Sequence, residues 1–194
     1  LSLVSEMLLQ NENLTELGLG GISIGDLSAL PSLTLPGNLF KVLDLSNTDI
    51  EDIELLRAQA ELQVLNLSGN LISDIEPLNN LQQLREINLS DNKLDDLTAL
   101  TTTDKLTKLI LSGNRDIDYS LQLKSIIERN LGLTHVGLAD IEIGMHGPDF
   151  YDHSTYAAYA LEELDLRNTG LIYSPVIEES LRKLDISDNN IGDF

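Results

Sequence analysis

One eleven-residue pattern recurs along the chain and constrains its fold more than any other feature. In LQVLNLSGNLI, from Leu62, apolar residues occupy the first, fourth, sixth and eleventh positions and asparagine the ninth. LREINLSDNKL from Leu84 and LRKLDISDNNI from Leu181 repeat it closely. Looser matches begin at residues 14, 40, 106, 133 and 161, so successive matches start 20 to 28 residues apart. Self-similarity at such a period indicates stacked structural units.

Each match predicts a short strand and the turn that follows it. Its fourth and sixth residues are apolar, which is the two-residue period of a strand with one buried face. Stacked units pair such strands into a parallel sheet. At the ninth position a buried amide can bond the backbone of the turn. That position holds Asn70, Asn92, Asn114 and Asn189, then Thr48 and Thr169, which offer only a hydroxyl, and finally Ile22 and Ile141. We expect a weaker hydrogen-bond ladder at the two isoleucines.

The pattern L-x-x-L-x-L-x-x-N-x-L resembles the template of leucine-rich repeat proteins over essentially the whole chain. The 22-residue repeats, clearest in LISDIEPLNNLQQL, are similar to those of internalins and SDS-type proteins, and the 26- to 28-residue repeats to the ribonuclease-inhibitor class. The resemblance implies an α/β fold, a right-handed horseshoe solenoid with a parallel sheet on the concave face and helices and turns on the convex face. It implies about eight repeats in one domain, residues 1–194.

Two segments are typical of convex-side helices, and a longer period relates them. They are 120–130, with Leu123, Ile126 and Ile127 on one face, and 5–13. LTELGLGGISIG from Leu14 matches LTHVGLADIEIG from Leu133 at seven of twelve positions. The starts 14, 40 and 62 map onto 133, 161 and 181 at offsets of 119 to 121. We infer a duplicated unit of five repeats.

Composition restricts the possible functions. The formal net charge of −20 disfavours binding to nucleic acid or anionic membrane, and no apolar run is long enough for membrane insertion. The absence of Cys excludes disulfides and suits a cytoplasmic protein, although many bacterial surface proteins also lack it. There is no G-x-S-x-G, H-E-x-x-H or phosphate-binding glycine loop. We therefore expect no catalytic residues, no cofactor and no enzymatic activity.

The segment GMHGPDFYDHSTYAAY (144–159) is the stretch that most resembles a ligand site. Its imidazoles and carboxylates suit zinc or manganese, but nothing fixes their geometry, so we expect no metal. We expect a surface loop packed by its own aromatic side chains, with protein binding as the stronger functional alternative. The duplication places it opposite DLSALPSLTLPGN (26–38), which has no histidine. The candidate residues are His146, Asp149, Phe150, Tyr151, Asp152 and His153.

Partners of such a solenoid usually bind its concave face, because a curved sheet displays a large and rigid surface. Mixed charges gather toward the C-terminal end of that face, whereas its centre is bland. The candidate residues there are His135, Glu163, Asp165, Arg167, Lys183 and Asp185, with Val42 and Val64 as a secondary apolar patch. Each of them also fits an ordinary solvated position.

These observations favour a non-enzymatic scaffold or regulator that binds another protein. The alternatives are a bacterial surface or secreted protein similar to internalins, and the recognition arm of a larger enzyme. The apolar start (Leu1, Leu3, Met7, Leu8 and Leu9) and an end just after a strand, NNIGDF, lead us to expect a fragment of a longer array. Uncapped ends would also allow end-to-end self-association.

Overall fold

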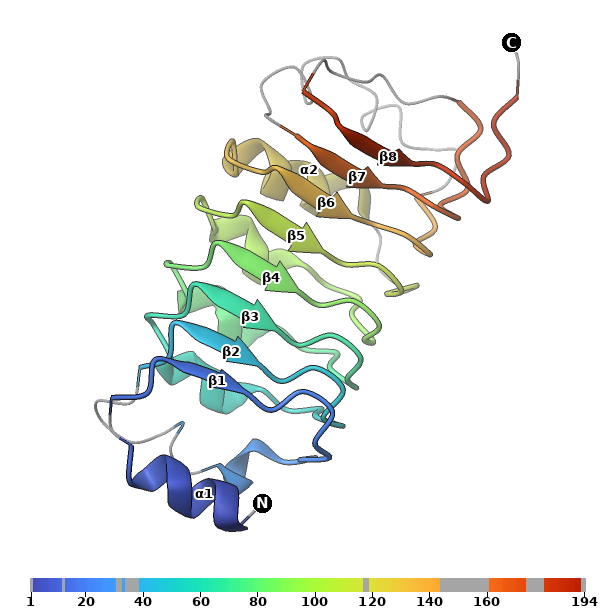
Figure 1. Cartoon of the computed structure of the whole chain (residues 1–194). Helices are drawn as coiled ribbons and strands as arrows, with labels where there is room; N and C mark the ends of the chain where they lie inside the picture. Colours follow the sequence, from blue (N-terminus) through green and yellow to red (C-terminus); the bar gives the residue numbers. More distant parts are fainter. Residues whose placement is uncertain are drawn as a thin grey trace.

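The computed structural model describes residues 2–11, 13–30, 33, 39–116, 119–143, 161–173 and 180–192. Within these ranges, eight strands form one parallel sheet in sequence order (Figure 1). Every strand begins two residues after the start of a sequence repeat, as the pattern predicts. The strands are β1 (Glu16–Gly18), β2 (Val42–Asp44), β3 (Val64–Asn66), β4 (Glu86–Asn88), β5 (Lys108–Ile110), β6 (His135–Gly137), β7 (Glu163–Asp165) and β8 (Lys183–Asp185).

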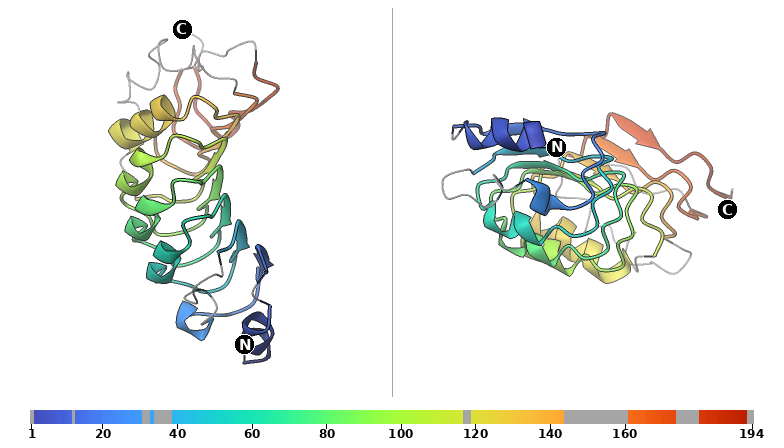
Figure 2. Two further views of the ribbon diagram at one scale, coloured as in Figure 1. Left: turned by 90° about the vertical axis from the view of Figure 1, so that its left-hand side faces the viewer. Right: turned by 90° about the horizontal axis from the view of Figure 1, so that it is seen from below.

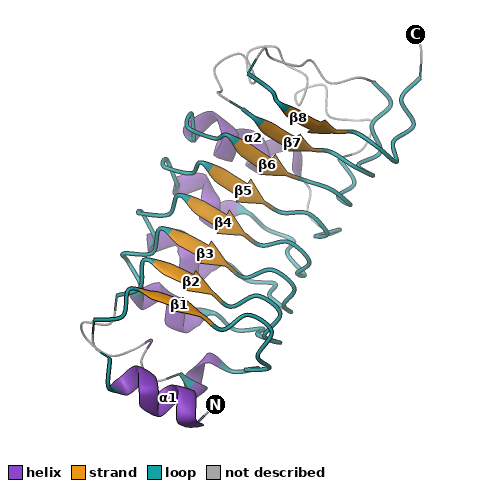
Figure 3. Cartoon of the chain, viewed as in Figure 1, coloured by secondary structure: helices purple, strands orange, loops and turns teal. Residues whose placement is uncertain are grey.

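The convex segments that follow the strands, with their helices and turns, lie on the side of the stack away from the strands, as Figures 2 and 3 show. The N-terminal helix, which was also expected there, lies instead at the end of the stack beside β1. The 22-residue repeats carry short 3-10 helices there, whereas the 27-residue repeat that starts at residue 106 carries an α-helix. That helix, α2, packs against η5. The helical elements are α1 (Ser2–Leu9), η1 (Leu27–Ala29), η3 (Glu54–Ala58), η4 (Glu76–Asn80), η5 (Thr98–Thr102) and α2 (Tyr119–Arg129).

The two predicted α-helices exist, but one has different bounds. Helix α2 matches the expected segment, and its apolar face (Leu123, Ile126 and Ile127) is buried. Helix α1 covers Ser2–Leu9 instead of 5–13. At its end, the carbonyl of Met7 accepts both the backbone N–H of Gln10 (3.3 Å) and the side-chain amide of Asn11 (2.7 Å).

The core consists almost wholly of Leu and Ile from the strands and the convex segments. In each central strand the middle residue is buried and its two neighbours are half exposed. The register places these buried residues side by side, as in Leu43 beside Leu65. Among the described residues, Phe40 is the one aromatic side chain in this core.

The asparagines of the ninth position form the predicted ladder. The Asn70 amide nitrogen donates to the carbonyls of Leu45 and Leu67, both at 2.8 Å. Its oxygen accepts from the backbone N–H of Thr48 (3.0 Å) and Ile50 (3.1 Å). One side chain thus joins two consecutive turns. Asn92, Asn114 and Asn189 bond their own and the preceding turn in the same way.

The substituted ninth positions differ from one another. Thr48 and Thr169 each donate a hydroxyl to the carbonyl three residues earlier, at 2.6 and 2.7 Å. Ile141 is fully buried, whereas Ile22 is 40% exposed. The two isoleucines hold the same position of the repeat, but their burial differs, because the first turn directs its side chain outward.

The eighth position of every repeat has a left-handed backbone, which the sequence analysis overlooked. Its φ lies between 52° and 81° at Gly21, Asn47, Gly69, Asp91, Gly113, Asp140, Asn168 and Asp188. Only Gly, Asn and Asp occur there, and these residues tolerate that region best. In two cases an Asn or Asp side chain occupies the space beside the glycine of the next repeat, Asn47 at Gly69 and Asp91 at Gly113.

We therefore expect Gly113→Ala to lower the free energy of unfolding by about 2 kcal/mol, measured by urea denaturation. The residue has φ of +81°, and an added methyl would collide with the Asp91 side chain. The matched control is Gly132→Ala, where the nearest atom would be 3.9 Å away and no positive φ is required. Equal stability of the two variants would contradict this account of the turn.

Candidate functional site on the concave face

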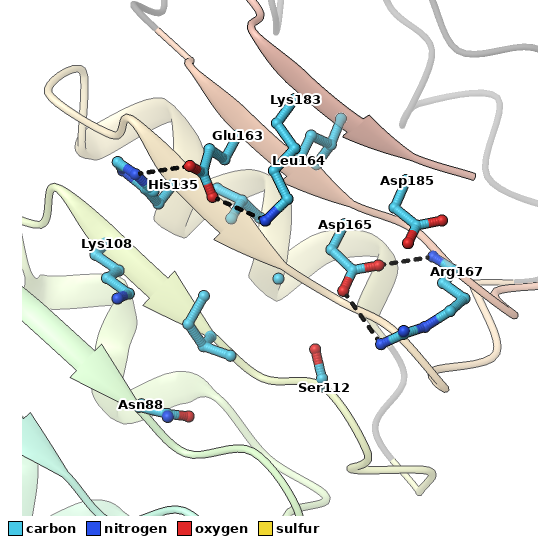
Figure 4. A pocket seen from close by; sticks show the side chains of 13 residues that line it. Asn88, Lys108, Ser112, His135, Glu163, Leu164, Asp165, Arg167, Lys183 and Asp185 are labelled. Atoms are coloured by element: carbon cyan, nitrogen blue, oxygen red, sulfur yellow. Dashed lines mark hydrogen bonds and ion pairs between the residues drawn. The ribbon is translucent and has the colours of Figure 1, made fainter. Parts of the chain in front are cut away.

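We define the concave face by three side chains of each repeat. Two belong to the first and third residues of the strand, and the other belongs to the residue two positions after that third residue. The buried middle residues point into the core, so these three rows face outward. The first row is Glu16, Val42, Val64, Glu86, Lys108, His135, Glu163 and Lys183. The six residues predicted at the C-terminal end of the concave face all line one pocket (Figure 4).

That pocket, which we call the concave pocket, has a volume of about 370 Å³ and lies over β4–β8. Gly137, the third residue of β6, lines it, and the side chains of Ile110 and Ser112 lie close beside this glycine. A β-carbon there would lie 3.0 Å from the Ile110 side chain and 3.3 Å from Ser112 Oγ. The lining residues are Asn88, Lys108, Ile110, Ser112, His135, Val136, Gly137, Glu163, Leu164, Asp165, Arg167, Lys183 and Asp185.

Glu163 joins two neighbouring strands electrostatically. The sheet register places it between His135 on β6 and Lys183 on β8. Its Oε1 lies 3.7 Å from His135 Nε2, and its Oε2 lies 3.4 Å from Lys183 Nζ. Ion pairs this exposed contribute little to stability. Their main effect is to arrange both signs of charge in fixed positions on the surface.

A second group of charges lies at the ends of β7 and β8. Asp165 Oδ1 accepts the backbone N–H of Arg167 (3.1 Å), and its Oδ2 lies 3.4 Å from the Arg167 guanidinium. Asp185 accepts both the hydroxyl (2.6 Å) and the backbone N–H (3.0 Å) of Ser187. These two aspartates therefore also shape the turns that follow their strands.

The pKa of the Asp185 carboxyl lies below its ordinary value of 3.8. The hydroxyl of Ser187 is the largest cause, followed by the Ser187 backbone N–H and then the charges of Arg167 and Lys183. All of them favour the ionised form. A lowered pKa means that Asp185 favours the folded state above its unfolded pKa, and that this contribution is lost as the pH falls through the lowered pKa.

We expect Ser187→Ala to raise the pKa of Asp185 toward its ordinary value, because the variant loses the hydroxyl but keeps the backbone N–H. The measurement is an NMR titration of the side-chain carboxyl carbons. Ser68→Ala is the matched control, since its hydroxyl donates to Asn66, which does not titrate. An unchanged pKa in Ser187→Ala would show that the hydroxyl is not the main cause.

Val42 and Val64 lie side by side on β2 and β3, outside the concave pocket. They are half exposed and form the predicted apolar patch. Under the 119-residue duplication they occupy the positions of Glu163 and Lys183. The two copies of the unit thus present different chemistry at equivalent places on the concave face.

Seven of the thirteen lining residues of the concave pocket were absent from the predicted site. Three of the seven are Asn88, Lys108 and Gly137, which lie on β4, β5 and β6, next to the residues that were predicted. The signal was present in the sequence, since the first and third strand positions can be read off the repeat. The charge-rich end was selected instead, and the boundary was drawn two repeats too late.

The loop candidates lie outside the described residues. These are His146, Asp149, Phe150, Tyr151, Asp152 and His153. In the part of the chain that the structure does describe, no three His, Cys, Asp or Glu side chains are grouped to hold a metal ion. Nor does any helix of that part have the length and apolar character needed to cross a bilayer.

Two buried amides near the start of the repeats were also overlooked. The Gln59 side chain accepts the N–H of Phe40 (3.0 Å) and donates to the carbonyl of Leu33 (2.7 Å). Asn130 accepts the N–H of Leu106 (2.8 Å) and donates to the carbonyl of Ile126 (2.7 Å). Each of these amides lies three residues before the next repeat and bonds the first residue of its own repeat. They therefore fix the entry to the strand of their own repeat, as the ninth-position asparagines fix its exit.

Models of leucine-rich repeats match the chain in separate places. One, described as "Leucine Rich repeats (2 copies)", matches residues 41–80 and 60–102. Another, described as "Leucine Rich repeat", matches residues 179–193. A comparison with curated proteins gave no significant match.

Several solved structures share the fold. Internalin C2 from Listeria monocytogenes has a TM-score of 0.61 and 29% identity over 91% of this chain and 64% of its own. A second internalin of that organism, inlF, has a TM-score of 0.69 and 23% identity over 96% and 52%. A chain of the Drosophila Toll–Spatzle complex has a TM-score of 0.62 and 26% identity over 81% and 23%.

The chain therefore spans less than two thirds of each of these proteins. The repeat models, the eight-stranded parallel sheet and these neighbours agree on one family. The chain is a member of the leucine-rich repeat superfamily.

Proposed function

We propose that the chain is a non-enzymatic module that binds another protein on its concave face, at the concave pocket. The observation that carries this proposal is the pocket itself, which brings together five charged residues predicted from the sequence and His135. One solved structure that shares the fold is the Toll–Spatzle complex. It supports protein binding by a chain of this fold.

The electrostatics support a protein partner. The pocket contains three carboxylates and three Lys or Arg side chains, so its formal charge is zero in a chain of net charge −20. A neutral area with fixed positive and negative groups suits the mixed polar surface of a protein. Alternating ion pairs also discriminate against partners that present the wrong sign.

The same groups are poorly arranged for catalysis. A general acid at neutral pH needs a carboxyl with a raised pKa. The pKa of Asp185 is lowered, and Glu163 and Asp165 are paired with cations. We therefore propose a binding role for these carboxylates.

The test is affinity capture from lysate of the source organism with three baits. These are the wild type, Arg167→Glu combined with Lys183→Glu, and a chain with residues 146–157 replaced by a Gly/Ser linker. We expect a protein that is captured by the wild type and the linker variant and lost with the charge reversals. A protein retained by the charge reversals but lost with the linker would place the binding site in the loop instead.

A second candidate is a secreted or surface protein of bacteria, similar to internalins. The 29% identity to internalin C2 favours it over a cytoplasmic scaffold or the recognition arm of a larger enzyme. Fractionation of the source cells, followed by immunoblotting, separates these roles. Recovery from the medium or cell envelope is expected for the internalin-like role, and recovery from the cytoplasm contradicts it.

End-to-end self-association is a further proposal, because β1 and β8 are the outer strands of the described sheet. Unpaired backbone groups on outer strands can pair with another chain. Sedimentation at increasing protein concentration tests it. A sedimentation coefficient independent of concentration would contradict it.

A further inference from the structure

We infer that the concave pocket holds an acidic side chain, Asp or Glu, of the partner protein, and that Lys108 is the cation that receives it. This inference rests on the proposed function and specifies the partner's chemistry at one point. It derives from a difference between the two sides of the pocket. On the side formed by β7 and β8 the charges are paired. On the side formed by β4 and β5 the lining residues are Asn88, Lys108, Ile110 and Ser112, and within the described part of the chain three of them have a hydrogen-bond donor without a partner.

Lys108 is the first residue of β5 and is half exposed at the pocket. The other two cations each have a carboxylate nearby, Lys183 with Glu163 and Arg167 with Asp165, both at 3.4 Å. Within the described residues Lys108 has no such partner. Glu86 is beside it in the sheet register, yet no ion pair joins the two. Figure 4 shows the ion pairs on the far side of the pocket and Lys108 apart from them.

Two neutral donors share this side with Lys108. The Asn88 side-chain oxygen is occupied by the backbone N–H (3.0 Å) and hydroxyl (2.8 Å) of Ser90, so its amide N–H groups remain. Ser112 Oγ accepts the backbone N–H of Ala139 (3.0 Å), so its own O–H remains. Among the described residues neither remaining donor has a partner. An ammonium, an amide and a hydroxyl can each donate to an acceptor oxygen of an anion.

The space for that anion is the concave pocket, which Lys108, Asn88 and Ser112 line. One positive group with two neutral donors suits a single negative charge. A doubly charged phosphate would carry excess charge close to Glu163 and Asp165 on the other side of the pocket. The rest of the chain is strongly acidic, so a run of acids would be repelled. The geometry thus points to one carboxylate in an otherwise neutral or basic segment.

The experiment uses a phage library of random 12-residue peptides, selected on the wild-type chain. Peptides that bind in the pocket are identified by loss of binding to Gly137→Val but not to Gly18→Val. The second variant is a matched control, because Gly18 occupies the same repeat position in the first copy and a β-carbon there meets nothing within 4 Å. Circular dichroism verifies that both variants fold.

We expect Asp or Glu to be enriched at one position of the pocket-binding peptides. Lys108→Met, and replacement of that acid by its amide, should each weaken binding about tenfold. Combining the two changes should cost no more than either alone, since they remove the same contact. Lys41→Met makes the same change of net charge at an exposed lysine that directly precedes β2 and should leave the affinity unchanged.

Two results would overturn the inference while leaving the proposed function intact: no acidic enrichment among pocket-binding peptides, or equal affinity for the wild type and Lys108→Met. A phosphoserine in place of the acid that binds more tightly would also overturn the choice of a carboxylate. If no selected peptide is sensitive to Gly137→Val, both the inference and the pocket as the binding site fail.

Discussion

Replacing Asn70 by alanine is expected to lower the free energy of unfolding by about 4 kcal/mol. The substitution removes a side chain that is only 5% exposed and bonds five backbone groups. The N–H groups of Thr48 and Ile50 then lose their partner, and the carbonyls of Leu45 and Leu67 keep only the Thr48 hydroxyl and the Asn92 amide. A buried polar group left unpaired costs roughly 1–3 kcal/mol, and some of these groups regain water at the turn.

The measurement is urea denaturation followed by circular dichroism. Asn80→Ala is the matched control, since Asn80 is exposed on the convex side and has no side-chain hydrogen bond within the described residues. We expect the control to stay within about 0.5 kcal/mol of the wild type. A loss for Asn70→Ala as small as that of the control would mean that the ladder does not stabilise the solenoid.

Phe40→Ala should cost about 4 kcal/mol, which is typical when a buried aromatic side chain is truncated. Phe40 is 1% exposed and is the one aromatic side chain in the described core, which otherwise consists of Leu and Ile. Its backbone N–H also bonds the buried Gln59 side chain. A cavity here would therefore remove packing at the start of the second repeat.

The adjacent residue provides the control. Leu39 is 41% exposed, so Leu39→Ala should change the free energy of unfolding by less than about 0.5 kcal/mol. Both variants are measured by the same urea titration. If Leu39→Ala proved as destabilising as Phe40→Ala, the assignment of the core at this repeat would be wrong.

The repeat alone predicts most of the fold. The period-two apolar pattern fixes which strand residues are buried, and the start of each match gives the start of each strand. The ninth-position amides were predicted because a buried Asn in an apolar pattern needs backbone partners. These features depend only on residues close together in the sequence.

Features that depend on neighbouring repeats were harder to predict. Ile22 and Ile141 occupy the same position of the pattern, but only Ile141 is buried. At the candidate site, the predicted residues were selected because that end of the face is rich in charge. Lys108 and Gly137 were missed because their place in the pocket depends on the pairing of β5 with β6.

The central claim, that a partner protein binds at the concave pocket, is tested most directly by one pair of dissociation constants. The partner captured by the wild type is titrated into Gly137→Val and Gly18→Val by isothermal calorimetry. We predict that binding is at least about tenfold weaker for Gly137→Val, because its side chain fills the pocket, and unchanged for Gly18→Val. Equal affinities for Gly137→Val and the wild type would contradict the claim.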